Sequence, residues 1–157
     1  MMKPTRERPP PPRSPPDQVV AALERIPLSP TDEHILPTMT IEASCHCGAV
    51  RVEVDTAPEL LTSCNCSVCR RLGSLWAYYS PSRVRITGAT VTYRWGDRML
   101  DLHHCGTCGC TTHWTGIDPS VGDRMGVNTR LMDPAVVAGV RIKRVDGAAD
   151  TWAELTD

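Results

Sequence analysis

Phenylalanine is absent from this 157-residue sequence, and tryptophan and tyrosine together make up only 4% of it. Aromatic side chains bury the largest areas in most protein cores, so a domain of this length without them has a thin core. A structural metal would make up that deficit, because binding free energy at such a site is folding free energy. The composition therefore predicts one domain that is stabilised by more than apolar burial.

Long apolar runs and a strong charge of either sign are also missing. No stretch approaches the roughly 20 apolar residues that a membrane-spanning helix needs. The formal net charge is −1, which gives no electrostatic basis for nucleic-acid binding. The first sixteen residues carry five charged groups and no apolar segment of a secretory signal. We therefore expect no membrane partner, no nucleic-acid partner and a cytoplasmic location.

What the sequence does have is clustered cysteine. Neighbouring thiols within a cluster are at most three positions apart, a spacing that suits thiolates converging on one ion at about 2.3 Å each. Disulfides fit this pattern poorly, because each sulfur would have to pair with a partner in another cluster. Clustered cysteines in a reducing cytoplasm are more often metal ligands than bridges, so zinc is favoured over a secreted disulfide framework. The eight cysteines are Cys45 and Cys47; Cys64, Cys66 and Cys69; and Cys105, Cys108 and Cys110.

Seven or eight thiolates are too many for one ion, so we expect two zinc ions per chain. A structural zinc has four protein ligands, whereas a catalytic zinc keeps three and leaves one position open. The sequence divides accordingly into a four-cysteine structural centre and a three-cysteine catalytic centre, formed respectively by Cys45, Cys47, Cys105 and Cys108 and by Cys64, Cys66 and Cys69.

Cys110 and His46 remain beside these predicted ligands. A fourth thiolate from Cys110 would close the three-cysteine centre and argue against catalysis. Its position two residues after Cys108 favours instead a small hydrophobic residue packed in the interior. His46 lies between two ligands, but the thiolates suffice without it, so we expect it to be exposed or to contact a ligand.

The chain is expected to divide near Met39. Residues 1–38 hold ten of the fourteen prolines, which favours a disordered extended arm. Within it, residues 17–26 have a short helical apolar pattern that ends at Pro27. Residues 39–147 form the predicted zinc-binding domain. Residues 148–157 are expected to be a frayed C-terminal tail, with Trp152 as the candidate to pack back.

From Thr40 the apolar pattern becomes short and alternating. Val50, Val52 and Val54 project to one face and the residues between them to the other, which is typical of a half-buried strand. Helical pattern is limited to residues 68–72 and to residues 134–137. The latter follow Asp133 as a probable N-cap. The sequence thus predicts an all-β, antiparallel domain with little helix. Further strands are predicted at 75–79, 83–87, 90–95, 100–104, 111–114, 125–128 and 140–145.

The cysteine motifs together resemble the glutathione-dependent formaldehyde-activating enzymes, a family that also includes centromere protein V. The resemblance covers roughly residues 40–145. It implies a β-tent-like fold, with a structural zinc on the four-cysteine set and a catalytic zinc on the three-cysteine set. It also implies carbon–sulfur lyase chemistry, in which formaldehyde and glutathione join as S-hydroxymethylglutathione in the founding activity. The segments that carry it are SCHCGAV at 44–50, CNCSVC at 64–69, CGTCG at 105–109 and GVNTRL at 126–131.

Four polar side chains are candidates to bind a small-molecule thiol or aldehyde substrate. Arg70 and Arg71 directly follow Cys69, and a guanidinium group is well shaped to pair with glutathione carboxylates. Asn128 and Arg130 match the late motif of the family, and strand alternation would place both on one face. The alternatives are solvated surface arginines and a structural role for Asn128.

The histidines and aromatic residues near the clusters have plainer interpretations. His103, His104 and His113 flank the third cluster, and a proton-transfer role for one of them competes with structural hydrogen bonding. In a domain without phenylalanine, the three aromatic residues nearest the clusters are expected in the core rather than in a pocket. They are Trp76, Tyr78 and Trp114.

The leading functional hypothesis is a zinc-dependent carbon–sulfur lyase acting on an adduct of a thiol with an aldehyde. The alternative from a different class is a non-enzymatic, zinc-stapled β module that binds a protein partner. A weaker third interpretation is a redox or zinc-buffering protein, in which oxidation of the middle cluster releases metal.

Overall fold

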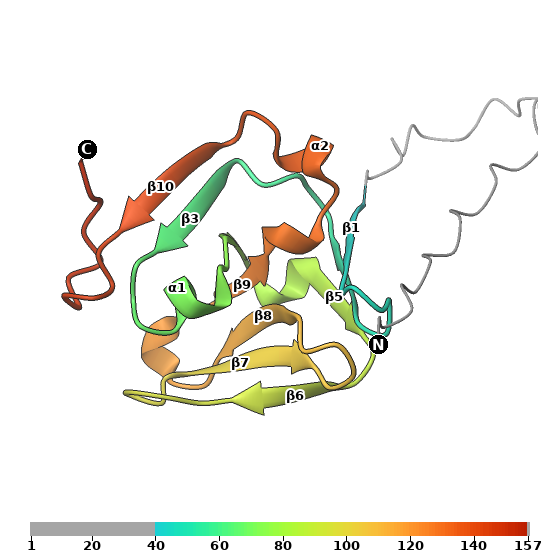
Figure 1. Cartoon of the computed structure of the whole chain (residues 1–157), viewed down its shortest axis with the longest axis horizontal. Coiled ribbons are helices and arrows are strands. Elements are labelled where there is room, and N and C mark those ends of the chain that lie inside the picture. Colours follow the sequence, from blue (N-terminus) through green and yellow to red (C-terminus); the bar gives the residue numbers. More distant parts are fainter. Residues whose placement is uncertain (1–39, 157) are drawn as a thin grey trace, which may run out of the picture. The chain divides into compact units, whose positions relative to one another are not determined.

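The computed structural model describes residues 40–156, so the predicted proline-rich arm and its short helix lie outside the described residues. This part of the chain is mostly β-structure with little helix, as predicted (Figure 1). None of its helices is long and apolar enough to cross a membrane. The elements are β1 (Ile41–Ser44), β2 (Arg51–Val54), β3 (Leu60–Cys64), α1 (Cys69–Leu72), β4 (Trp76–Tyr79), β5 (Val84–Thr87), β6 (Thr90–Tyr93), β7 (Leu100–Cys105), β8 (Thr111–Gly116), β9 (Met125–Asn128), α2 (Pro134–Val137) and β10 (Arg141–Val145), with 3-10 turns at Pro81–Arg83, Pro119–Val121 and Thr129–Leu131.

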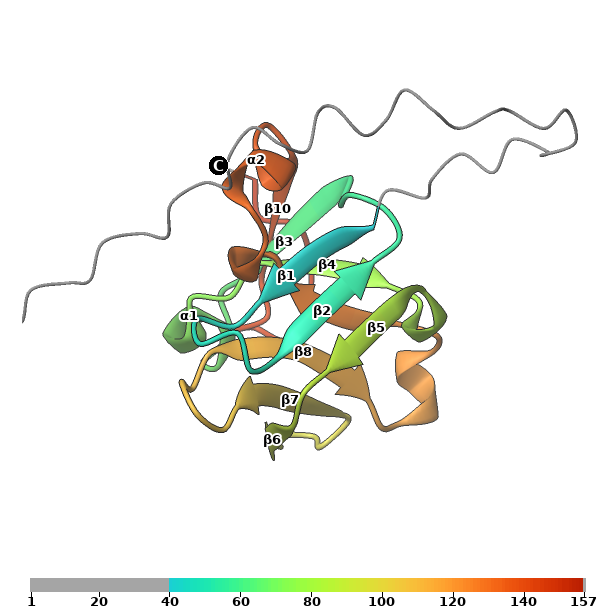
Figure 2. The ribbon, with the colours of Figure 1, turned by 90° about the vertical axis from the view of Figure 1, so that its right-hand side faces the viewer.

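The strands form two sheets (Figure 2). One has three strands in the order β1-β2-β5, and the other has seven in the order β10-β3-β4-β9-β8-β7-β6. The pairing is antiparallel as predicted, except that β10 runs parallel to β3. A parallel pair needs a long connection, and the chain supplies one, because β4 to β9 lie between these two strands in the sequence.

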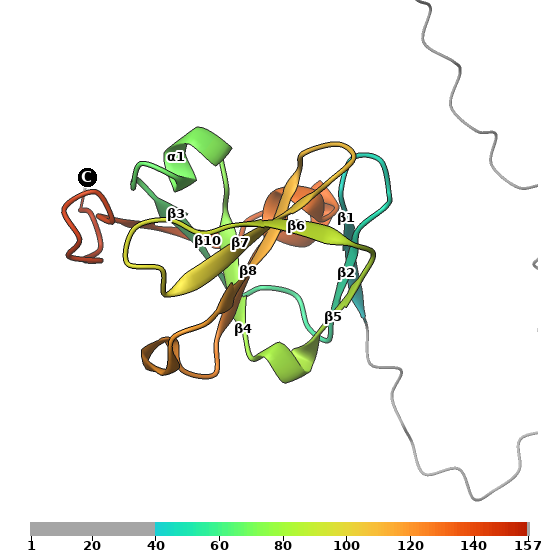
Figure 3. The same cartoon turned by 90° about the horizontal axis from the view of Figure 1, so that it is seen from below.

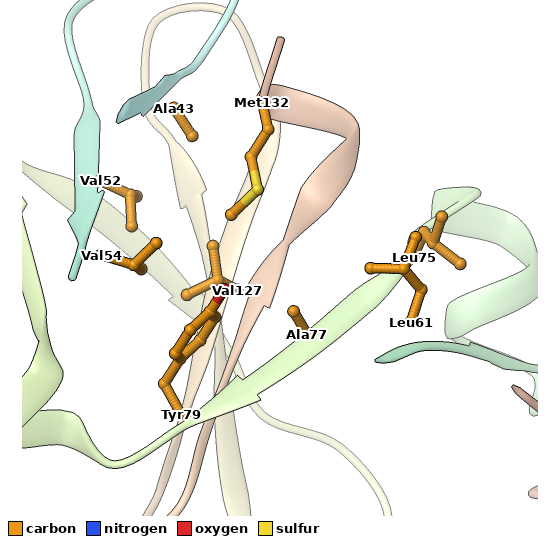
Figure 4. Close-up of a cluster of buried hydrophobic side chains, with 9 residues drawn as sticks. All are labelled: Ala43, Val52, Val54, Leu61, Leu75, Ala77, Tyr79, Val127 and Met132. Carbon is orange, nitrogen blue, oxygen red and sulfur yellow. The ribbon is translucent and has the colours of Figure 1, made fainter. Parts of the chain in front are cut away.

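The main core lies between the two sheets (Figure 4). Val52 and Val54 from β2 are each 1% exposed, and Val127 from β9 is 0% exposed, so the alternation seen in the sequence does mark the buried face of β2. Each such side chain contributes about 1.5–3 kcal/mol when it is fully buried. The other members of this cluster are Ala43, Leu61, Leu75, Ala77, Tyr79 and Met132.

A second cluster covers the opposite face of the larger sheet. Trp76, Leu102 and Trp114 are buried there, and Val68 and Cys69 pack against them. Because side chains alternate along a strand, Trp76 points away from the main core while Ala77, its neighbour on β4, points into it. This second cluster fixes α1 and the loop before it to the sheet, away from β2 and β5 (Figure 3).

The link between the two sheets requires a glycine. Gly88 joins β5 to β6 with a φ of 93°, a backbone conformation that side chains with a Cβ rarely adopt. A Cβ at this position would lie 2.0 Å from the carbonyl oxygen of Ala49. The close approach brings the β6–β7 hairpin next to the loop that follows β1.

The end of the chain folds back along β10 rather than fraying. The backbone N–H of Leu155 donates to the carbonyl of Arg144 at 2.9 Å, and that of Asp146 donates to Ala153 at 2.9 Å. Val145 and Glu154 form an isolated antiparallel bridge. The residues expected to form a loose tail are therefore tied to the sheet edge.

Candidate metal centres

The first centre joins two places that are far apart in the sequence. Cys45 and Cys47 follow β1, Cys105 ends β7, and Cys108 lies in the turn before β8. Their four sulfurs lie within 4.8 Å of one another. The distance from Cys47 Sγ to both Cys45 Sγ and Cys105 Sγ is 3.6 Å. The four-cysteine set predicted from the sequence is thus brought together at one point.

A backbone hydrogen bond and two glycine turns position the sulfur atoms of this centre. The N–H of Val50 donates to Cys45 Sγ at 3.3 Å. Gly48 and Gly109 have φ values of 76° and 74° and close the two tight turns that hold the cysteine pairs. Val50 is completely buried beside Cys45 and Cys105, which form a small core with it, while Cys47 lies exposed at the edge of the centre.

The second centre comes from one local loop. Cys64 ends β3, Cys66 follows in the loop, and Cys69 begins α1. Their sulfurs lie within 4.8 Å of one another, as those of the first centre do. The backbone N–H of Cys66 donates to Cys64 Sγ and that of Cys69 donates to Cys66 Sγ, both at 3.4 Å. The indole Nε1 of Trp76 donates to Cys69 Sγ at 3.3 Å.

Both sets of sulfurs fit a tetrahedral zinc. A zinc–sulfur distance of about 2.3 Å places the corners of a tetrahedron about 3.8 Å apart, close to the 3.6 Å separations in the first centre. A disulfide would require about 2.05 Å, and all eight cysteines are free. Donor hydrogen bonds to ligand sulfurs are the contacts that orient metal ligands in proteins. Both clusters are therefore suited to hold a metal ion.

Each centre also contains one thiol that ionises readily. The hydrogen bond shared with Cys64 lowers the pKa of Cys69 to about 5, while the same interaction raises the pKa of Cys64. The two thiols therefore titrate as a pair that shares one proton. In the first centre the backbone N–H of Cys110 leads the contacts that lower the pKa of Cys108 to about 5. A thiolate is the form that binds metal.

Cys110 and Ser74 are the two further residues to consider around the three-cysteine centre. Cys110 packs against the small core of the first centre, so it does not supply a fourth thiolate to the second. The Ser74 hydroxyl is buried and makes no hydrogen bond of normal geometry in the described residues. It lies near Cys69, because a contact from Ser74 helps to lower the pKa of that thiol, after the larger effects of Cys64, burial and Trp76.

A pocket of about 350 Å³ opens beside the second centre. Cys64 and Cys69 line it together with Arg70, Arg130 and Arg144, and none of its lining residues is acidic. The pocket therefore combines two candidate ligand sulfurs with a strongly basic wall. This combination suits a small anionic molecule that can reach the metal.

A sequence model of the glutathione-dependent formaldehyde-activating enzyme family matches residues 40–145. This range contains both cysteine clusters and the whole of both sheets. The chain belongs to that family.

One solved structure resembles this chain in sequence and in fold. A crystal structure of a Rhodobacter sphaeroides protein is 31% identical in sequence, with a TM-score of 0.54. The match covers 65% of this chain and 99% of the Rhodobacter chain. The two proteins therefore share their sequence pattern and fold over nearly the whole Rhodobacter chain.

The four polar side chains that the sequence singled out in this family member divide into two pairs. Arg70 and Arg130 line the pocket. Arg71 turns back and donates from Nη1 to the carbonyl of Ser67. Asn128 is 5% exposed, and its amide accepts from the backbone of Leu75 and Arg130 and donates to the backbone of Thr111.

The expectation that Asn128 and Arg130 share a strand face is wrong. Strand β9 ends at Asn128, and Arg130 lies in the 3-10 turn Thr129–Leu131 that follows. Asn128 caps this turn through the N–H of Arg130. The change from strand to turn lets the Arg130 side chain reach the pocket while the Asn128 amide stays inside.

The histidines of this formaldehyde-activating family member have structural contacts. His103 and His113 stack with ring centroids 4.1 Å apart. His103 bonds to the hydroxyls of Thr90 and Thr115, and His113 bonds to that of Thr112. Neither ring lines the pocket beside Cys64 and Cys69. His46 is exposed and stands outside the cysteine cluster beside it.

Tyr78 differs from the core position expected for it. Trp76 and Trp114 are buried, but Tyr78 is 40% exposed on the same sheet face. Its ring lies 5.8 Å from that of Trp114, and the guanidinium carbon of Arg124 is 5.2 Å from the ring centre. Burial raises the pKa of the Tyr78 phenol, and a hydrogen bond with Thr62 opposes the shift. The charges of Cys69 and Cys64 raise it further, which places Tyr78 on the side of the second centre.

Sequence reasoning missed strand β3 and several residues of the pocket, among them Arg144 and Ser74. Strand β3 lies between β10 and β4, and its neighbouring residues Leu61 and Thr62 are both buried although they point to opposite faces. Such a strand lacks the alternation by which strands are recognised. The sequence predicts Arg144 only as part of the strand at 140–145, and Ser74 lies between two predicted elements. The parallel pairing of β10 with β3 is what brings Arg144 to the cysteine loop, and no local pattern in the sequence predicts it.

Proposed function

We propose that this protein is a zinc-dependent carbon–sulfur lyase that acts on an adduct of a small thiol with an aldehyde, such as that of glutathione with formaldehyde. The observation that carries the proposal is the contrast between the centres. One cluster has four sulfurs, enough to complete a tetrahedral zinc shell, whereas the other has three sulfurs beside a basic pocket. We assign a structural zinc to the first and a catalytic zinc to the second.

The reaction balances without any oxidant or reductant. In the direction of addition, a bond forms between the thiol sulfur and the aldehyde carbon, and the thiol proton ends on the former carbonyl oxygen. The reverse reaction breaks the same bond and restores thiol and aldehyde. Zinc held by Cys64, Cys66 and Cys69 would supply an open coordination position that favours the thiolate form of an incoming thiol.

The protein's own residues would bind and orient the substrate. Arg70 and Arg130 offer guanidinium groups to the carboxylates of a thiol such as glutathione, and such paired hydrogen bonds are strong and directional. No carboxylate lines the pocket, so no acidic side chain competes with the substrate for these guanidinium groups. The guanidinium groups of Arg70 and Arg130 therefore favour an acidic low-molecular-weight thiol over a neutral one.

Proton transfer requires a group near the substrate oxygen. His103 and His113 are occupied with hydroxyl partners. Tyr78 has a hydrogen bond with Thr62 and, like the two histidines, does not line the pocket. We therefore assign the proton transfer to water in the pocket.

The decisive experiment replaces zinc by cobalt and titrates the protein with glutathione. A change in the cobalt–thiolate absorption is expected, because an exogenous thiolate adds to the three-cysteine centre. The same protein should speed adduct formation between glutathione and formaldehyde as followed by NMR. The Cys66→Ser variant should stay folded and lose both responses. An unresponsive spectrum would favour the non-enzymatic zinc-stapled module that binds a protein partner.

A further inference from the structure

The end of the chain lies against the second centre. Because β10 pairs in parallel with β3, Val145 lies beside Cys64. The N–H of Asn65 donates to the carbonyl of Val145 at 3.3 Å, so the chain beyond Val145 continues along the cysteine loop. We call residues 146–155 the C-terminal turn. It begins just after the segment 40–145 that matches the family.

The side chain of Asn65 holds the start of this turn at two points. Its Nδ2 donates to Asp146 Oδ1 at 2.9 Å, and its Oδ1 accepts from the N–H of Ala148 at 2.7 Å. The hydrogen bond from Asn65 is the main cause that lowers the pKa of Asp146, so this carboxylate is charged when it binds the amide. Asn65 lies between Cys64 and Cys66, and its amide thereby ties both ligands to the turn.

Gly147 packs directly on the ligand sulfur. A Cβ at this position would lie 2.5 Å from Cys64 Sγ and 3.2 Å from Cys66 Cβ. Gly147 is not among the glycines with positive φ, so its backbone conformation is open to other residues. What excludes a side chain is the position of the Cys64 sulfur. Any larger residue must displace either that sulfur or the turn.

The remainder of the turn is held firmly by its own contacts. The N–H groups of Thr151 and Trp152 donate to the carbonyl of Asp146 at 3.3 and 3.2 Å. Trp152 has a φ of 55°, which is rare for a bulky residue and persists only where surrounding contacts impose it. Leu155 lines the pocket beside the cysteines. The turn is thus an ordered wall of the site.

We propose that the C-terminal turn is part of the second metal centre, with Asn65 and Gly147 as positioning residues that hold Cys64 and Cys66 in their ligating arrangement. Their role is to retain the metal. The proposal requires that the three-cysteine centre binds zinc, as the proposed function does, but it does not depend on the reaction.

Exchanging the side chains of Asn65 and Asp146 tests the hydrogen bond between them. Asn65→Asp places two carboxylates against each other, and we expect zinc at the second centre to bind about tenfold to a hundredfold more weakly. In the double variant Asn65→Asp with Asp146→Asn, the new amide at position 146 can donate to the new carboxylate at position 65. The zinc affinity of the second centre should therefore return to near the wild-type value. Zinc affinity is measured by competition with a chromophoric chelator, and the fold is checked by circular dichroism.

The contact between Gly147 and the Cys64 sulfur is tested with a variant and a matched control. Gly147→Ala should lose zinc from the second centre while the first centre keeps its metal, and the cobalt spectrum of the three-thiolate site should change. Ala149→Ser adds an atom to an exposed residue of the same turn and should leave both unchanged. Equal zinc affinity in wild type, Asn65→Asp and Gly147→Ala would overturn the proposal. A wild-type cobalt spectrum that ignores glutathione would reject the lyase reaction and leave this result intact.

Discussion

The indole nitrogen of Trp76 donates a hydrogen bond to the sulfur of Cys69 across 3.3 Å. Trp76 is 2% exposed and packs in the cluster that includes Leu102 and Trp114. The core on this face of the sheet therefore fixes one sulfur of the cysteine loop. Groups that hydrogen-bond to metal ligands orient them and tune the metal, so this contact links sheet packing to the chemistry of the second centre.

Trp76→Phe should weaken zinc at the second centre by about tenfold to a hundredfold. The variant keeps an aromatic ring but loses the donor, and the pKa of Cys69 should rise above its value of about 5. Chelator competition measures the first effect and thiol titration of the metal-free protein the second. Trp114→Phe makes the same chemical change in the same cluster and is the control. An equal loss in both variants would show that packing alone is responsible.

Cys105→Ser should unfold the domain, whereas Cys66→Ser should not. Cys105 is 1% exposed and ties the β7–β8 hairpin to the loop after β1. A structural zinc site contributes about 10–16 kcal/mol, which equals or exceeds the whole stability of a typical domain, about 5–15 kcal/mol. Cys66 connects only residues of one loop. Thermal unfolding followed by circular dichroism compares the two. Cys110→Ser, outside both clusters, should fold like the wild type.

Arg70→Ala and Arg130→Ala should each raise the KM for glutathione about tenfold to a hundredfold, because removing a hydrogen bond to a charged group costs about 1.5–3 kcal/mol. Arg71→Ala should have little effect, since its guanidinium binds the carbonyl of Ser67. Steady-state kinetics with glutathione and formaldehyde distinguish these outcomes. A larger effect from Arg71 than from its neighbour Arg70 would contradict the assignment of the pocket.

His113 should make the fold sensitive to mild acid. Burial lowers its pKa to about 3, while an unfolded histidine titrates near 6.5. Between these values the unfolded chain binds the extra proton, so the free energy of unfolding falls as pH decreases below about 6.5, by at most about 1.4 kcal/mol per unit. His113→Gln removes this dependence. Urea unfolding from pH 7 to 5 should show a steeper loss in wild type than in the variant, and parallel curves would exclude His113 as a cause.

Local patterns in the sequence predicted much of this fold. The alternation at Val50, Val52 and Val54 marked a buried strand face, and Asp133 does cap α2 through the N–H of Ala135. Cysteine spacing grouped the sulfurs as the structure groups them. In each case the signal lies within a few residues, where backbone geometry fixes the relation of one side chain to the next.

What the sequence did not reveal depends on distant pairing. The contact of the C-terminal turn with Asn65 requires β10 to pair with β3 in parallel register, and no turn or periodicity signals that pairing. The exposure of Tyr78 likewise depends on which side chains cover its sheet face. Such relations arise from tertiary packing and leave no short pattern to detect.

The central claim is that two unlike metal centres exist, one closed by four thiolates and one with three. Metal analysis of purified protein tests it most directly. We expect two zinc ions per chain in wild type, and one in a folded Cys66→Ser variant that has lost the second centre. A single zinc in fully folded wild type, or two retained by Cys66→Ser with unchanged affinity, would contradict the account.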